Sequence, residues 1–288
     1  PLVEMEDISI SFGGLHAVER ASIDLYRGEV VGLLGHNGAG KSTLMKALAG
    51  LLPVDGELSV LGHHPVRERT RLLEQLSYIP DVAVLPRWAR VRELIGLMQG
   101  LHPRFSAERA RALIKRTSVD AGDKIASLSK GMVTQVHLAL MAAIDAKLMI
   151  LDEPALGLDV LSRKAFYEML IDEWCDGQRS VLISTHQVEE VEALLSDVMM
   201  LNEGQLVLSL SLEALEKRFF ALGHDEHAAQ QVAAAHPLLR YRSPGGPAAL
   251  FDGEPPPELS QLGQRLRPSL VDLFMALTRR PEINRTQF

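Results

Sequence analysis

The sequence predicts an α/β protein in which a parallel sheet carries helices on its faces. Short apolar runs at residues 30–34, 148–151, 181–184 and 198–201 are typical of strands that are buried on both faces. Helical patterns lie between these runs, and an alternation of strands and helices favours a parallel sheet. A glycine-rich segment, residues 35–40, follows the first run directly.

Other segments are expected to surround this sheet. Residues 2–12 and 23–26 alternate apolar and polar side chains, which predicts two strands of an antiparallel layer. Residues 41–52 have the pattern of a helix that follows the glycine-rich segment. Residues from about 82 to 145 are mostly helical in pattern and predict a helical subdomain.

The character of the sequence changes after about residue 210. Two helical patterns, a stretch rich in proline and glycine that predicts a linker or loop, and a last helical segment follow at residues 212–220, 226–235, 243–257 and 269–278. We therefore expect a first domain over residues 1–210. Residues 211–288 are expected to form a C-terminal extension with a regulatory or dimerising role.

Composition limits the choice of partners. The chain has 288 residues with 30 Lys+Arg against 37 Asp+Glu, and this acidic balance argues against nucleic acid. The one cysteine, Cys175, excludes an internal disulfide and is expected to be a buried thiol. The longest apolar stretches, such as residues 136–144, are shorter than the roughly 18 residues of a membrane span. Contact with a membrane is therefore expected through a partner.

Residues 35–43 match the phosphate-loop pattern G-x-x-x-x-G-K-[ST]. In such a loop the backbone N–H groups surround the phosphates, so the side chains must be small, and the following helix points its positive end at the anion. Lys41 adds a charge, and the Ser42 hydroxyl can ligate Mg²⁺. The residues expected to hold the nucleotide here are Gly35, Asn37, Gly38, Ala39, Gly40, Lys41, Ser42 and Thr43.

Four further motifs follow in the order found in ATP-binding cassette (ABC) ATPases. They are LSKGM at residues 128–132 for the signature motif, LMILDEP at 148–154 for Walker B, GLD at 157–159 for the D-loop, and His186 for the switch histidine. From residue 2 to about 210 the chain resembles this family. The resemblance implies a P-loop NTPase core with a parallel sheet, an adjoining antiparallel β-subdomain and a helical subdomain. It also implies ATP and Mg²⁺ as cofactors.

The resemblance assigns roles within the chain's own site. Asp152 ends an apolar strand and is expected to hold Mg²⁺ through water. Glu153 is expected to polarise the attacking water as a general base. His186 is expected to sense the γ-phosphate, although an ordinary histidine is the alternative. Phe12 stands where the family stacks an aromatic ring on adenine, and a core phenylalanine at a strand end remains the alternative.

Other residues are expected to serve a second subunit. Ser129 and Gly131 open a helix and so provide an anion site from free N–H groups and the helix dipole. In the family this site binds the ATP of the other subunit, and we include Asp159 of the D-loop among the nucleotide contacts. The expected partners are a second ABC ATPase subunit and an integral membrane permease. The expected location is the cytoplasmic side of a bacterial inner membrane.

Two motifs depart from the family pattern. Lys130 and Met132 stand where the usual signature, LSGGQ, has glycine and glutamine, which leaves those contacts open. Asp81 occupies the Q-loop position, where the family usually has glutamine. We expect Asp81 to act in catalysis and on Mg²⁺, directly or through water, and a helix cap is the alternative.

The stretch after Asp81 is unusually apolar for an expected loop. Val82, Val84, Leu85 and Trp88 lie there, and loops are normally exposed and polar. Docking of a permease helix in a groove beside this loop would explain these side chains. Packing against the helical subdomain would explain them too.

The predicted function is ATP hydrolysis that drives a separate permease. Residues 267–278 resemble the C-terminal segment of family members that serve small two-gene bacterial exporters, which favours export. The apolar face of this segment is expected to pack on the core or on a partner subunit; it consists of Leu270, Leu273, Phe274 and Leu277. The alternatives are a soluble ABC ATPase that acts on ribosomes or DNA, and a nucleotide-gated regulatory subunit.

Overall fold

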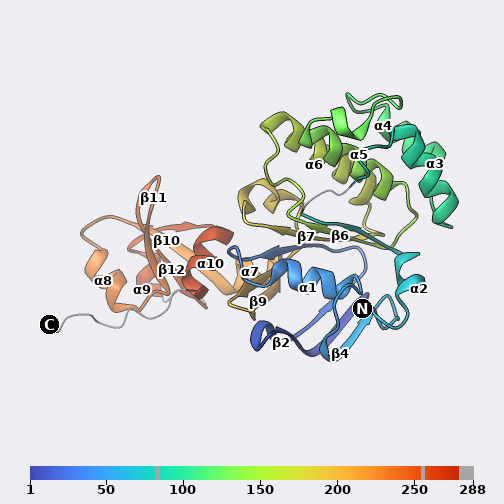
Figure 1. Cartoon of the computed structure of the whole chain (residues 1–288). Helices are drawn as coiled ribbons and strands as arrows, with labels where there is room; N and C mark the ends of the chain where they lie inside the picture. The colour runs from blue at the N-terminus through green and yellow to red at the C-terminus, as the bar shows by residue number, and fades with distance from the viewer. Residues whose placement is uncertain (82–84, 254–256, 279–288) are drawn as a thin grey trace.

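The computed structural model describes residues 1–81, 85–253 and 257–278 (Figure 1). Its central sheet has six strands, which in spatial order are β5 (Leu76–Ile79), β6 (Leu148–Asp152), β7 (Ser180–Thr185), β3 (Val30–Leu34), β8 (Asp197–Asn202) and β9 (Gln205–Ser211). The pairs from β5 to β8 are parallel, and β9 runs antiparallel to β8. The predicted α/β class with a mainly parallel sheet is confirmed.

A three-stranded antiparallel sheet covers one side of the molecule, in the order β2 (Leu15–Leu25), β1 (Val3–Phe12), β4 (Asp55–Val60). Helix α1 (Lys41–Leu48) lies between the two sheets, because Leu44 packs in one cluster with Ile8 of β1 and Leu33 of β3. The predicted antiparallel layer is therefore present. Helix α1 ends four residues before the predicted helix does, and Gly50 follows with a φ of 70° that a glycine adopts without strain.

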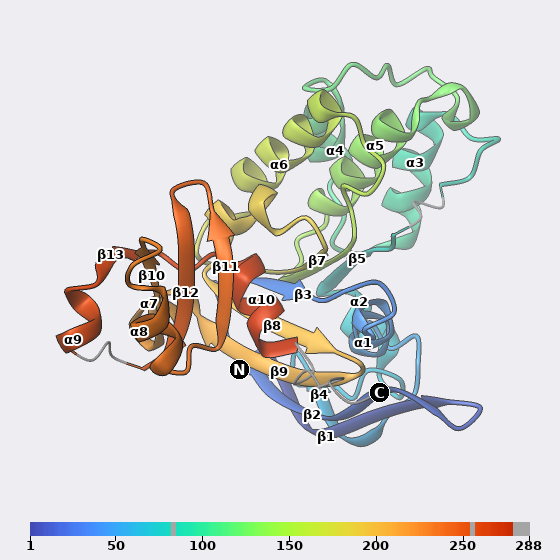
Figure 2. The same cartoon turned by 90° about the vertical axis from the view of Figure 1, so that its left-hand side faces the viewer.

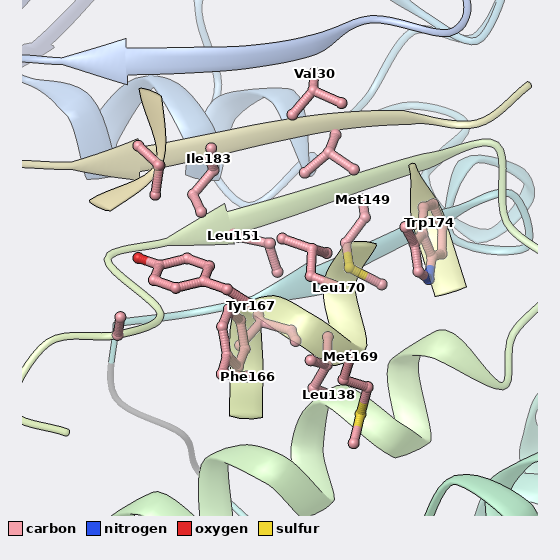
Figure 3. Close-up of a cluster of buried hydrophobic side chains, with 14 of the residues drawn as sticks. Val30, Leu138, Met149, Leu151, Phe166, Tyr167, Met169, Leu170, Trp174 and Ile183 are labelled. Atoms are coloured by element: carbon pink, nitrogen blue, oxygen red, sulfur yellow. The ribbon is translucent and has the colours of Figure 1, made fainter. Parts of the chain in front are cut away.

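Helices cover the opposite face of the central sheet. They are α3 (Val91–Leu101), α4 (Ala107–Ile114), α5 (Lys130–Ala142) and α6 (Val160–Trp174), with α2 (Arg69–Leu73) at the edge. A 3₁₀ turn, η1 (Ile125–Ser127), precedes α5, and two more, η2 (Val188–Glu190) and η3 (Glu192–Leu194), lie between β7 and β8. Figure 3 shows Leu138 of α5 and Leu170 of α6 against Met149 and Leu151 of β6. The predicted helical subdomain is formed by α3 to α5. No helix in the three described ranges is long and apolar enough to cross a bilayer.

The C-terminal part contains a four-stranded antiparallel sheet in the order β11-β12-β10-β13 (Figure 2). Its elements are α7 (Leu212–Arg218), β10 (Phe219–His224), α8 (Ala229–Ala234), β11 (Leu239–Ser243), β12 (Gly246–Asp252), α9 (Pro257–Ser260), β13 (Gly263–Leu266) and α10 (Leu270–Thr278). The prediction of a loop over residues 243–257 is wrong, because β12 lies within it. Both central strands, β10 and β12, are short and contain buried alanines, and alanine is a poor indicator of a strand.

Helix α10 packs on the chain's own core. Leu270 and Leu273 are 1% and 0% exposed and lie in one cluster with Phe219 and Leu239 of the C-terminal sheet. The apolar face predicted for this segment is therefore covered by the same chain. The other face of this sheet carries α8 and α9, where Phe220 stacks on Phe251.

We predict that Leu273→Ala lowers the free energy of unfolding by about 3 kcal/mol, because it removes a fully buried side chain and leaves a cavity. Met275→Ala on the same helix is the matched control, since Met275 is 42% exposed and its loss should cost less than about 0.5 kcal/mol. Equilibrium unfolding in urea measures both values. Equal shifts in the two variants would contradict the packing described for α10.

Candidate active site

The glycine-rich loop joins β3 to α1 and passes very close to other parts of the backbone. A Cβ atom on Gly35 would collide with the carbonyl of Leu201, and one on Gly40 would collide with the carbonyl of Ala17. Gly40 also has a φ of 105°, which other residues rarely adopt. These two glycines are therefore required for the path of the loop and for the start of α1.

Lys41 directs its ammonium group into the loop. Its Nζ donates to the carbonyl oxygen of Gly35 at 2.8 Å and to that of His36 at 3.3 Å. The same atom lies 3.2 Å from Oε1 of Glu153, and both side chains are at least nine-tenths buried. A cation is thus held where the phosphates of a nucleotide would bind.

Asp152, at the carboxyl end of β6, anchors the adjacent part of the site. Its Oδ1 accepts from the Ser42 hydroxyl and from the Ser184 hydroxyl, each at 2.9 Å. Burial raises the pKa of this carboxyl group, the two hydroxyls lower it, and the charge of Asp81 raises it. Asp81 therefore lies close enough to act on this group electrostatically.

The residues here fit a Mg²⁺ ion. The second oxygen of Asp152, Oδ2, is buried and has no hydrogen-bond partner within the described ranges. A hard cation takes such oxygens as ligands, and Mg²⁺ in nucleotide sites uses one or two carboxylates with phosphate oxygens and water. Asp152 and Ser42 supply the protein share of such a set. A contribution from Asp81 stays a prediction.

Glu153 follows Asp152 and is held from three sides. Its backbone has a φ of 46°, a left-handed conformation that is uncommon for a non-glycine residue. Its N–H donates to the Ser184 hydroxyl at 2.8 Å, which fixes this conformation. Its Oε2 lies 2.8 Å from Nδ1 of His186, while Oε1 faces Lys41. A carboxylate held in this way could accept a proton from a water molecule, so the general-base role of Glu153 stays a prediction.

The signature and D-loop residues lie together at the N-termini of α5 and α6. Ser129 caps α5, and Asp159 caps α6 by accepting from the N–H of Ser162 at 2.9 Å. A Cβ on Gly131 would lie 2.7 Å from the Cβ of Ser162, so glycine is required for the two helix ends to meet. The two helices therefore present their positive ends side by side.

The structure joins several expected residues into one bonded network, namely Lys41, Ser42, Asp152, Glu153 and His186. Ser184 links its two halves, and sequence reasoning did not single it out; its place two residues before His186 was the available signal. Asn37 and Gly38 are exposed on the loop, and Ala39 N–H donates to the carbonyl of His36 at 3.1 Å.

The remaining expected residues lie at the margins of the network. Thr43 is half-buried on α1. Phe12 is 50% exposed at the end of β1, which excludes the alternative of a core phenylalanine. Val82 and Val84 lie outside the described residues.

The sequence matches known proteins over most of its length. A family described as ABC transporter matches residues 18–156. The Nod factor export ATP-binding protein I of Sinorhizobium fredii is 35% identical over 213 residues, which cover 72% of this chain and 62% of that protein. The aliphatic sulfonates import ATP-binding protein SsuB 2 of Streptomyces avermitilis is 31% identical over 247 residues, which cover 80% of this chain and 94% of that protein.

Solved structures agree with the fold. One described as an ATP-binding subunit of an ABC transporter has a TM-score of 0.68 at 28% identity and covers 75% of this chain and 92% of its own. Another, a dimeric ATP-binding cassette in a post-hydrolysis state with ADP and Pi, has a TM-score of 0.64 at 18% identity. It covers 73% of this chain and 98% of its own, and at this identity the likeness concerns the fold alone.

We predict that Lys41→Ala destabilises the nucleotide-free protein by about 3 kcal/mol, because it leaves the buried carboxylate of Glu153 without its cation. The double variant Lys41→Ala/Glu153→Gln should recover most of this loss, since it removes the uncompensated charge. Urea unfolding of the two variants and the wild type tests the pair. A double variant as unstable as Lys41→Ala would show that the charge of Glu153 does not carry the cost.

Proposed function

The chain belongs to the family of ABC transporter ATP-binding proteins, and on this basis we propose that two such subunits hydrolyse MgATP together to drive a membrane permease in export. The chain is an ATPase of this family. The observation that carries the proposal is the buried network in which Lys41, Asp152 and Glu153 meet at the phosphate loop.

The network explains how hydrolysis would depend on bound nucleotide. Loop N–H groups and the N-terminus of α1 bind the phosphates. The phosphates then compete with Glu153 for the ammonium group of Lys41, which frees the carboxylate to accept a proton from the attacking water. His186 keeps that carboxylate in place through Nδ1. Ser42 and Asp152 would hold Mg²⁺, which would neutralise charge on the phosphates.

Exposed apolar side chains support the proposed dimer. Val160 and Leu161, next to Asp159, are 79% and 78% exposed, and Leu156 nearby is 42% exposed. Apolar groups gathered on a surface in this way are typical of a contact with another protein. A second copy placed there would cover them and bring its nucleotide to the N-terminus of α5. A solved structure with a similar fold is described as dimeric, which is compatible with a dimer of this chain.

A groove beside Asp81 is proposed to receive the permease. It has a volume of about 350 Å³ and is lined by Asp81, Leu85, Arg87 and Val133 among others. Leu85 also packs on the core. Trp88 does not line the groove but follows the lining residue Arg87 directly and is 74% exposed, so it can serve as an anchor beside the groove. Docking there would hold the subunit at the cytoplasmic side of the bacterial inner membrane.

Export remains part of the proposal. One relative named above is an exporter subunit and another an importer subunit, so the relatives support both directions. The resemblance of residues 267–278 to exporter subunits favours export. We further propose that residues 1–210 form the ATPase domain. The extension over residues 211–288 is proposed to have a regulatory or dimerising role.

Glu153→Gln should still bind ATP but should lower turnover by about 10²-fold or more, because the amide cannot accept the proton. ATP should then hold the variant as a stable dimer, which size-exclusion chromatography with and without ATP detects. Phosphate release measures the turnover. Wild-type turnover in the variant would reject the role given to Glu153.

Trp88→Ala should weaken binding to the permease by roughly thirty-fold, the loss that follows from about 2 kcal/mol at an aromatic anchor. ATPase activity of the free subunit should stay close to that of the wild type. Leu101→Ala is the matched control, since Leu101 is 71% exposed on α3 of the same subdomain. Co-purification with the membrane partner separates the outcomes, and unchanged recovery of Trp88→Ala would remove this residue from the interface.

A further inference from the structure

Lys130 of the signature motif makes a contact that the usual glycine at this position cannot make. It is the first residue of α5, and its Nζ donates to the carbonyl oxygen of Leu156. Leu156 lies in the turn that connects β6 to α6, and its own N–H donates back to the carbonyl of Glu153 at 3.0 Å. One chain of bonds therefore runs from the start of α5 to the catalytic glutamate.

The turn that contains Leu156 and Gly157 leaves room for the Lys130 side chain. Gly157 has a φ of 72°, and a Cβ atom built on it would lie only 2.8 Å from Nζ of Lys130. A larger residue at 157 would therefore displace the ammonium group. In addition, Gly131 lies close to Ser162, so the start of α5 also contacts the first turn of α6.

The positive charge of Lys130 lies in the first turn of α5. A cation in the first turn of a helix opposes the positive end of the helix dipole, so lysine is an unfavourable choice there. The carbonyl of Leu156 gives the ammonium group a partner away from the end of the helix, and the four-carbon stem of lysine spans the distance. The contact therefore accounts for a lysine at this site.

We propose that Lys130 is a positioning residue that connects two parts of the chain. One is the N-terminus of α5, which would bind the partner's nucleotide, and the other is the loop after β6, which contains Glu153. The proposal rests on the dimer proposed above, in which the N-terminus of α5 faces the nucleotide of the second copy. Glu153 of the same chain acts on the chain's own nucleotide. When the N-terminus of α5 binds the partner's nucleotide, the hydrogen bond from Lys130 to Leu156 fixes the position of the loop between Glu153 and Asp159. The two sites are thereby coupled.

Three substitutions separate the possible roles of Lys130. Lys130→Gly restores the residue usual in the family, Lys130→Met keeps the stem without a donor, and Lys130→Arg keeps a charged donor. Isolated subunits are used, because Lys130 also lines the groove proposed for the permease. The measurements are kcat, KM for MgATP, the Hill coefficient for ATP and the melting temperature.

The glycine and methionine variants should lose about tenfold in kcat, because the loop that carries the base is less well positioned. KM should stay within about twofold, since no group that holds the chain's own nucleotide changes. The Hill coefficient should fall towards one, and the melting temperature should not change. Lys130→Arg should retain most of the wild-type kcat and Hill coefficient. Lys164→Met on α6 is the control, since the Lys164 side chain is 72% exposed and forms an ion pair with the exposed Glu168 on the same helix.

Several results would overturn the proposal. Wild-type kcat and Hill coefficient in Lys130→Met would show that the contact does not serve hydrolysis. A raised KM at unchanged kcat would instead make Lys130 a nucleotide contact, and an arginine variant as impaired as the methionine variant would exclude a donor role. A wild-type subunit without ATPase activity would overturn the proposed function, and this inference with it.

Discussion

The buried ion pair between Lys41 and Glu153 is the interaction on which the site depends. Removing two charges from water is costly, and a single partner rarely compensates for the loss. Here the ammonium group also donates to two loop carbonyls, and the carboxylate also contacts His186. These bonds fix the phosphate loop, the end of β6 and the segment after β7 relative to one another. In the proposed mechanism the phosphates compete for the same ammonium group, so this ion pair would link nucleotide binding to the release of the Glu153 carboxylate.

Backbone conformation makes this pair possible. Glu153 turns away from the strand with a positive φ, which costs about 1–3 kcal/mol unless the surroundings hold it. The Ser184 hydroxyl provides that support, since it accepts from the N–H of Glu153 and donates to Asp152. The two adjacent carboxylates thus have different partners: Asp152 contacts the hydroxyls of Ser42 and Ser184, and Glu153 contacts Lys41 and His186. A small hydroxyl on the neighbouring strand separates them.

The central sheet could be predicted from the sequence, whereas the C-terminal sheet and the contact of Lys130 could not. Apolar runs such as residues 148–151 are long enough and apolar enough to identify buried strands, and motif order identified Lys41 and Glu153. The C-terminal strands could not be identified, because β12 combines proline, alanine and glycine and is stabilised only by its neighbours in the sheet. The contact of Lys130 with Leu156 depends on how α5 and α6 pack, and no local pattern reports such packing.

The C-terminal part contacts the turns that follow His186 as well as the core. Helix α10 contacts η2, the turn that follows His186, and the guanidinium of Arg267 lies 2.8 Å from Glu216 and 3.9 Å from Glu192 of η3. From the other side, Arg163 of α6 pairs with Glu190 of η2 and donates to the carbonyl of Leu158 at 3.1 Å. The turn after His186 is therefore held between the helix that follows the D-loop and the helix that closes the C-terminal sheet. These contacts restrain the position of the turn from both sides, because close-packed elements leave little room for one of them to move alone.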